Sequence, residues 1–211
     1  MRLDHVSYAV SHSELVDTVQ RLGQQLGGSF EDGGRHPRFG TRNFILPLAD
    51  GCYVEVVSAL DHPAADKAPF GRAVAQRAQD GGGWMSWVVS VDDLSPVEER
   101  LGRTAVEGRR IRPDGHELRW RQIGVLDVMA DPQLPFFVQW LSPSEDHPSA
   151  TGSSVSIEKV EMCGESDAIK EWLDGAHEAV QGSIEVEWVD AEDPGLVAVW
   201  FRTPHGSVRI D

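Results

Sequence analysis

A histidine and a glutamate occupy two segments of this sequence that both alternate like β-strands. His5 lies within residues 3–10 and Glu55 within residues 52–59, so that fifty residues separate them. Imidazole and carboxylate groups transfer protons and bind divalent metal ions, so the pair could do chemistry if its strands meet. The corresponding positions of two later strand pairs carry Ser86 with Gln139 and Lys159 with Arg209.

This recurrence indicates duplicated structural units. In each unit, the apolar spacing and the glycine- and proline-rich turns predict a strand, a helix and three further strands. In the first unit the elements are expected at residues 3–10, 13–26, 29–32, 43–48 and 52–59, with a glycine-rich loop at 33–40. In the second they are expected at 84–91, 96–101, 104–110, 117–124 and 135–141. A Ser-, Pro- and Gly-rich linker at 142–154 precedes a third unit with elements at 155–162, 166–181, 183–189, 196–202 and 206–210.

Alternation along the first strand predicts where His5 points. One face carries Val6, Tyr8 and Val10, and it is the better apolar layer for packing on a helix. His5 is then expected on the opposite face, away from the helix.

The composition excludes several classes of protein. The 211 residues carry a formal net charge of −15, which repels phosphate backbones and argues against a nucleic-acid partner. No apolar run is long enough to span a bilayer, and the N-terminus begins a strand without a signal peptide. Cys52 and Cys163 have no metal-binding spacing. We therefore expect a cytoplasmic protein with free thiols and no membrane partner.

Four segments together suggest a family: residues 3–6 (LDHV), 33–43 (GGRHPRFGTRN), 50–55 (DGCYVE) and 135–140 (PFFVQW). With the order of elements, they resemble the glyoxalase-like branch of the vicinal oxygen chelate superfamily. The resemblance implies an α+β fold in which two βαβββ modules, at 1–59 and 84–141, form a cupped, incompletely closed barrel. Residues 155–211 would be one further half-module.

The resemblance also implies a metal site built from the first and last strands of each module. The residues at these positions are His5, Glu55, Ser86 and Gln139. His5, Glu55 and Gln139 could ligate Fe, Ni, Zn or Mn, but the hydroxyl of Ser86 departs from the pattern. Two alternatives stay open: a divalent metal at this site, or a metal-free cavity in which His5 and Glu55 hydrogen-bond each other. Glu55 is the candidate catalytic base.

Several other residues are candidates for binding a substrate. His36 lies in the glycine-rich loop, which could close over the cavity, and Asn43 and Tyr53 lie on the strands that follow. Arg119 and Arg121 share one face of a central strand, with Trp120 on the other. They either grip a substrate carboxylate or pair with acids at the rim. The remaining histidines are expected on loops or the surface without a catalytic role: His12, His62, His116, His147, His177 and His205.

The sequence thus predicts a protein with a small-molecule ligand and leaves its activity open. One hypothesis is a lyase, isomerase or dioxygenase acting on a small oxygenated metabolite. The other is a metal-free binding protein of the resistance or sensor type. For the third unit, Lys159 and Arg209 leave two options: an appendage that supports packing or a homodimer, or an anion-binding pocket.

Overall fold

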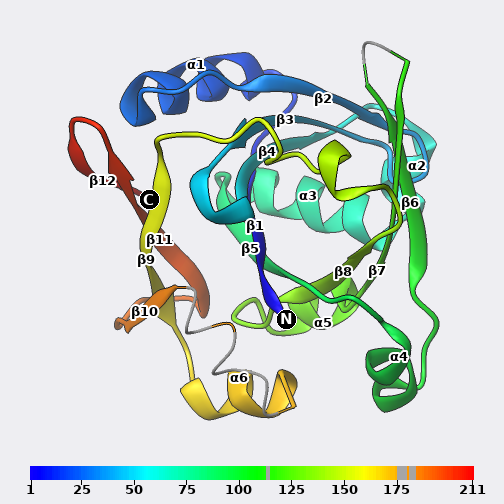
Figure 1. The fold of residues 1–211 in the computed structure, drawn as a ribbon. Helices are drawn as coiled ribbons and strands as arrows, with labels where there is room; N and C mark the ends of the chain where they lie inside the picture. The colour runs from blue at the N-terminus through cyan, green and yellow to red at the C-terminus, as the bar shows by residue number, and fades with distance from the viewer. Residues whose placement is uncertain (113–114, 175–179, 181–183) are drawn as a thin grey trace.

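The computed structural model describes residues 1–112, 115–174, 180 and 184–211 (Figure 1). The first module contains β1 (Arg2–Ala9), α1 (Leu15–Leu26), β2 (Glu31–His36), β3 (Thr41–Pro47) and β4 (Tyr53–Ala59). Helices α2 (Pro63–Lys67) and α3 (Pro69–Gln79) lead to the second, which contains β5 (Gly83–Ser90), α4 (Ser95–Leu101), β6 (Val106–Ile111), β7 (Glu117–Ile123), α5 (Val125–Ala130) and β8 (Phe136–Trp140). The chain continues with β9 (Ser156–Cys163), α6 (Ser166–Trp172), β10 (Glu185–Trp188), β11 (Gly195–Thr203) and β12 (Gly206–Ile210). None of the helices in this described part has the length and apolar character needed to cross a bilayer.

The two modules form one eight-stranded barrel in the order β1-β4-β3-β2-β6-β7-β8-β5. In each module the first strand pairs in parallel with the last, and the other pairs are antiparallel. β1 joins β5 along most of its length, whereas β2 meets β6 at one residue pair, Arg35 with Ile111. The α+β fold with paired βαβββ modules is therefore confirmed, and the barrel is closed by this short contact.

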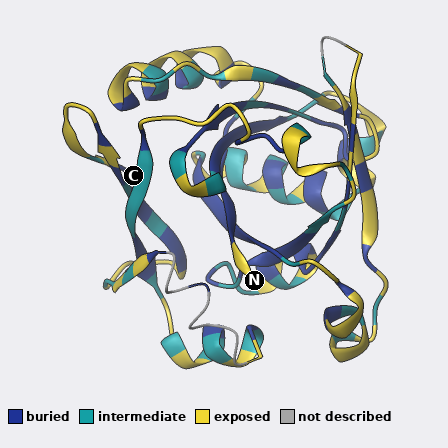
Figure 2. Cartoon of the chain, in the orientation of Figure 1, coloured by how far each residue is buried: buried dark blue, intermediate teal, exposed yellow. Residues whose placement is uncertain are grey.

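Alternation divides β1 between two apolar cores. On β1, Val6 and Tyr8 face outward and pack with α1, for example against Leu22. Ala9 faces inward and belongs to a second core with Phe70 and Val74 of α3. α3 thus covers one end of the barrel, and Figure 2 shows the strands around it as buried. Burying both faces of the strands holds the interior side chains in place.

The glycine-rich segment at 33–40 is a strand in its first half, which corrects the loop prediction. β2 runs through Gly33 and Gly34 to His36, and only residues 37–40 form the turn. The register shifts between Asp32 and Gly34, and Gly34 has a φ of 94°. Such a bulge needs a residue that tolerates positive φ, so these glycines mark a bent strand.

The C-terminal sheet keeps the predicted order of elements but pairs its strands differently. Its order is β10-β9-β11-β12, so the first strand lies between the second and third, not beside the last. Lys159 pairs with Glu187, and Arg209 donates to Glu161 at 2.7 Å. These cations already have carboxylate partners, so they do not form the anion pocket considered above. The predicted continuation of α6 over residues 175–179 and 181 lies outside the described residues.

Candidate functional site

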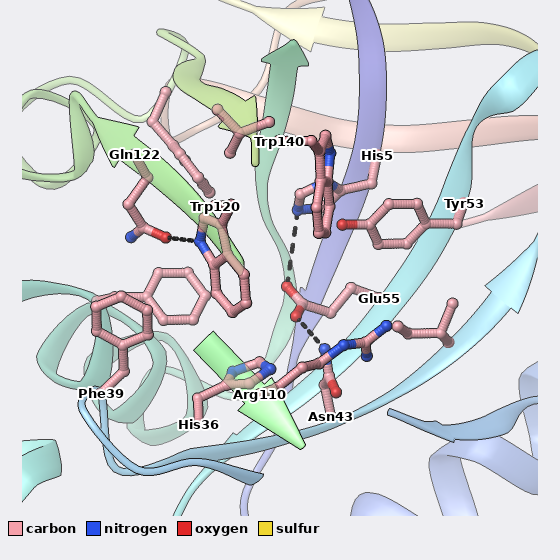
Figure 3. Close-up of a pocket in the computed structure, with 14 residues that line it drawn as sticks. His5, His36, Phe39, Asn43, Tyr53, Glu55, Arg110, Trp120, Gln122 and Trp140 are labelled. Carbon is pink, nitrogen blue, oxygen red and sulfur yellow. Dashed lines mark hydrogen bonds and ion pairs between the residues drawn. The ribbon is translucent and has the colours of Figure 1, made fainter. Parts of the chain in front are cut away.

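A small cavity of about 30 Å³ lies inside the barrel, with room for about two water molecules (Figure 3). The first module contributes most of its polar wall, and the second contributes mainly aromatic and aliphatic side chains. The lining residues are His5, His36, Phe39, Asn43, Ile45, Tyr53, Glu55, Phe70, Arg110, Trp120, Gln122, Phe136, Val138 and Trp140.

A fully buried carboxylate, Asp4, supports one side of this cavity. It accepts hydrogen bonds from His5 Nδ1 at 2.8 Å, from His147 Nε2 at 3.2 Å and from Trp140 Nε1 at 3.0 Å. Burial opposes ionisation of Asp4, but the hydrogen bonds from His147 and His5 outweigh it and hold its pKa well below the usual range. Asp4 is therefore a fixed negative charge beneath the cavity wall.

His5 is oriented by this charge. A register shift between Leu3 and His5 bends β1, and the carboxylate of Asp4 reaches the neighbouring ring. Because Nδ1 donates to Asp4, Nε2 is the nitrogen that faces Glu55 Oε2, at 3.9 Å. The ring also stacks on Tyr53, with 4.4 Å between centroids. The sequence prediction that His5 faces the barrel interior is correct.

Glu55 is held by two donors from neighbouring strands. Asn43 Nδ2 donates to Oε1 at 2.6 Å and Ser7 Oγ donates to Oε2 at 2.9 Å. Oε2 therefore accepts from Ser7 and also faces the cavity towards His5. Two groups capable of proton transfer face each other across the cavity, as Figure 3 shows.

His36 is a buried, uncharged member of the wall. Its Nδ1 lies 3.0 Å from Thr41 Oγ1, and its ring packs against that of Trp120 at 5.5 Å. Burial lowers the pKa of His36 from 6.5 to about 4, so it is neutral near pH 7. Because it lies on β2, it lines the cavity as part of the barrel wall and not on a closing loop.

Five of the predicted site residues meet in the cavity, and three do not. His5, His36, Asn43, Tyr53 and Glu55 line it together. Gln139 instead donates to the backbone oxygen of Asp92 at 2.8 Å. Arg121 pairs with Glu98 at 2.5 Å and the exposed Arg119 with Glu107 at 3.7 Å, the second of the two options given for these arginines.

The barrel register explains the place of Gln139. β1 aligns His5 with Tyr53 on β4, and β5 aligns Val88 with Phe136 on β8. The second-module residues equivalent to His5 and Glu55 are therefore Val88 and Val138, not Ser86 and Gln139. A shift of one residue turns a side chain to the other face of a strand, which is what separates Gln139 from the cavity.

The residues present do not fit the four-ligand metal site that the resemblance implies. A catalytic zinc site needs about three protein ligands, and of the four implied positions only His5 and Glu55 face the cavity, because the second-module position carries the apolar Val138. His36 also lines the cavity but does not form a ligand group with them. Among the described residues, no group of three His, Cys, Asp or Glu side chains is placed to hold a metal ion. A guanidinium in the same wall, that of Arg110, adds positive charge where a dication would bind.

Sequence reasoning missed Arg110 and the support that Asp4 receives from His147. His147 was expected on the surface, but it is buried and its Nδ1 accepts from the backbone nitrogen of Ser149. Its segment, residues 142–154, passes across the barrel in the view of Figure 1. No local pattern marks such a residue. Trp120 could have been found, because it alternates with Arg119 and Arg121, which face outward.

Comparison with known proteins gives one family and a common fold. The family model described as "Glyoxalase-like domain" matches residues 3–177. No curated protein matches. A hypothetical protein from Staphylococcus aureus has a similar structure, with a TM-score of 0.62 and 16% identity over 100% of this chain and 85% of that one. A methylmalonyl-CoA epimerase from Mycobacterium tuberculosis has a TM-score of 0.46 and 17% identity over 67% and 89%.

Proposed function

Because the chain belongs to the glyoxalase-like domain family, we propose that it is a metal-independent enzyme that moves a proton on a small oxygenated molecule. Membership of the family supports a protein that binds or modifies a small metabolite. The step to proton transfer rests on the side chains of the cavity. The donor set argues for chemistry without a divalent metal, since the second module contributes no ligand at the equivalent positions.

One observation carries the proposal: His5 Nε2 faces Glu55 Oε2 at 3.9 Å, and both groups are oriented by other side chains. Asp4 holds the imidazole, and Ser7 and Asn43 hold the carboxylate. Groups fixed in this way need little reorganisation when charge moves.

These positions define a balanced proton transfer. Glu55 takes a proton from the carbon beside a carbonyl group, and His5, in its protonated form, gives one to a neighbouring atom of the substrate. Asp4 stabilises the imidazolium, as a carboxylate does in a catalytic triad. The proton that Glu55 took from the substrate then passes to His5 across the gap between them, which restores both groups. The aromatic wall keeps bulk water from the reacting atoms.

A metal-free binding protein is the second candidate. It is favoured by the rings of Phe39, Phe70 and Trp120, which suit an apolar ligand surface. A binding protein would hold a ligand in the same place without exchanging its protons.

Solvent exchange separates the two candidates. The protein would be incubated in D2O with small carbonyl compounds, including neutral hydroxyketones and 2-oxo acids, and deuterium incorporation followed by NMR. We expect exchange that survives EDTA treatment and falls roughly 10²–10⁴-fold in Glu55→Gln and His5→Gln, the usual contribution of an acid or base. Glu117→Gln and His205→Gln, at exposed positions, are the matched controls.

Two results would contradict the proposal. Ligand binding by the wild-type protein without any exchange would favour the binding protein. Exchange that disappears with EDTA and returns with a divalent metal would show that the reaction needs a metal after all.

A further inference from the structure

Arg110 lies where the inner cavity meets a larger cleft. The cleft has a volume of about 350 Å³ and lies between β2, β6 and residues 145–151. Ile45 and Arg110 line both spaces. A molecule that passes from the cleft towards His5 and Glu55 would therefore pass the guanidinium of Arg110.

The guanidinium of Arg110 is buried without a charged partner in the described part of the chain. The residue is 4% exposed. Its Nη1 donates to the backbone oxygen of Gly33 at 2.9 Å, its Nε has no hydrogen-bond partner, and no described carboxylate lies within ion-pair distance. Buried arginines are rarely left unpaired, because removing the charge from water is costly. An anion at this position would therefore complete the interactions of Arg110.

A second unpartnered group lies beside it. The Oδ1 atom of Asn43 is buried and accepts no hydrogen bond. A Cβ atom at Gly33 would lie 2.0 Å from this oxygen and 2.5 Å from Arg110 Nη1, so both groups converge on the bare backbone of β2. Figure 3 shows Arg110 beside Asn43 in the cavity wall. Because Oδ1 is an acceptor, a hydroxyl group of the ligand, and not its carboxylate, would complete this hydrogen bond.

We propose that Arg110 binds a carboxylate group of the substrate, while the rest of the molecule reaches towards His5 and Glu55. This rests on the proposed function, since the atoms beyond the carboxylate would exchange the proton. The planar guanidinium matches a carboxylate in shape. A phosphate is disfavoured, because its second charge would meet Glu55 inside and Glu31 and Glu145 at the cleft.

The test compares charged ligands with uncharged ligands of the same shape. Acetate and propionate, and in parallel acetamide and propionamide, would be titrated at fixed ionic strength. Binding would be followed by the change in intrinsic tryptophan fluorescence, to which Trp120 and Trp140 in the cavity wall contribute. We expect the wild-type protein to bind the acids at least tenfold more tightly than the amides. Arg110→Gln should abolish this preference, and Arg110→Lys should retain part of it.

Arg119→Gln is the matched control, because it removes an exposed arginine of the outer face and should keep the preference for acids. Near-UV circular dichroism checks that the variants are folded. If Arg110→Gln does not fold, the proposal is tested by the preference of Arg110→Lys for acids and by the ratio of acid to amide affinity in the wild-type protein. Equal binding of acids and amides, tighter binding of inorganic phosphate, or unchanged binding in the Arg110 variants would overturn the proposal.

The result is separable from that of the proposed function. A preference for acids that depends on Arg110, without deuterium exchange in any compound, would sustain the carboxylate site and refute the enzyme. Exchange that depends on Glu55 but is equal for acids and neutral ketones would sustain the enzyme and refute the carboxylate site.

Discussion

The two modules of the barrel present different chemistry from equivalent positions. In the first, His5 and Glu55 point into the cavity, whereas the register places Val88 and Val138 at the same positions of the second. The first and last strands pair in the same way in both modules, so this pairing does not require polar side chains on the inner face. A duplicated module can keep its fold while one copy loses its polar residues.

The polar and apolar walls support each other physically. Trp140 of the second module donates to Asp4 of the first, so the apolar half also supplies a hydrogen bond. Exclusion of water by the aromatic side chains strengthens electrostatic interactions around His5 and Glu55. The four predictions below test how far the two walls can be separated.

The largest effect is expected at the buried carboxylate of the polar wall. Asp4→Asn would remove the charge that accepts from His5, His147 and Trp140, and leave at least one donor unpaired. We expect a loss of about 3–5 kcal/mol in unfolding free energy, the cost of removing one partner from a buried charged group. Urea denaturation measures it, with the exposed Asp17→Asn as control. A loss no larger than that of the control would mean that Asp4 does not hold the wall together.

His36 predicts how stability depends on pH. Its pKa falls from 6.5 to about 4 on burial, so between these values the unfolded chain binds a proton that the folded chain does not. The contribution of neutral His36 to the unfolding free energy is therefore fully present above about pH 6.5. It is lost as the pH falls towards 4, by about 3 kcal/mol in total. Comparing wild type with His36→Asn by urea denaturation across pH 4–7 isolates this contribution, and the exposed His205→Gln is the control. Parallel curves for wild type and His36→Asn would contradict it.

A change in the apolar wall should affect stability and leave the chemistry largely intact. Phe136→Leu replaces a buried ring with a smaller aliphatic side chain. The ring packs near His5, with 6.2 Å between ring centroids. We expect a loss of about 1–2 kcal/mol in unfolding free energy, within the usual range for a point change in a core. Deuterium exchange should fall by less than tenfold. A fall in deuterium exchange as large as that of Glu55→Gln would mean that the apolar wall takes a direct part in the reaction.

The sequence predicted the site residues of the first module better than those of the second module. Alternation placed His5 and Glu55 correctly, because each strand has one clearly apolar face and the register follows from it. On β8, Phe136, Phe137 and Val138 are all apolar, so alternation could not decide which of them faces inward. The fold class followed from the order of elements, whereas the pairing of the C-terminal sheet did not.

Long-range contacts account for the remaining omissions. Asp4 and His147 lie 143 residues apart in sequence, and their hydrogen bond depends on how residues 142–154 cross the barrel. Arg110 occupies an alternating strand in which Arg109 and Arg110 are equally polar, and only barrel closure selects which one turns inward. Such residues require the tertiary structure to be found.

The smallest effect is expected at Gln139, which separates the ligand set implied by the family from the cavity found here. Its side chain bonds the backbone of Asp92 at 2.8 Å and of Leu94 at 3.4 Å, outside the cavity. Gln139→Ala should therefore cost about 1 kcal/mol in unfolding free energy, the scale of ordinary hydrogen bonds, without changing carboxylate binding or deuterium exchange. Val138→Ala, one residue earlier on the inner face, is the matched comparison and should alter ligand binding. If Gln139→Ala abolished exchange and Val138→Ala did not, the second module would contribute a functional group after all, and the contrast between the two walls would fail.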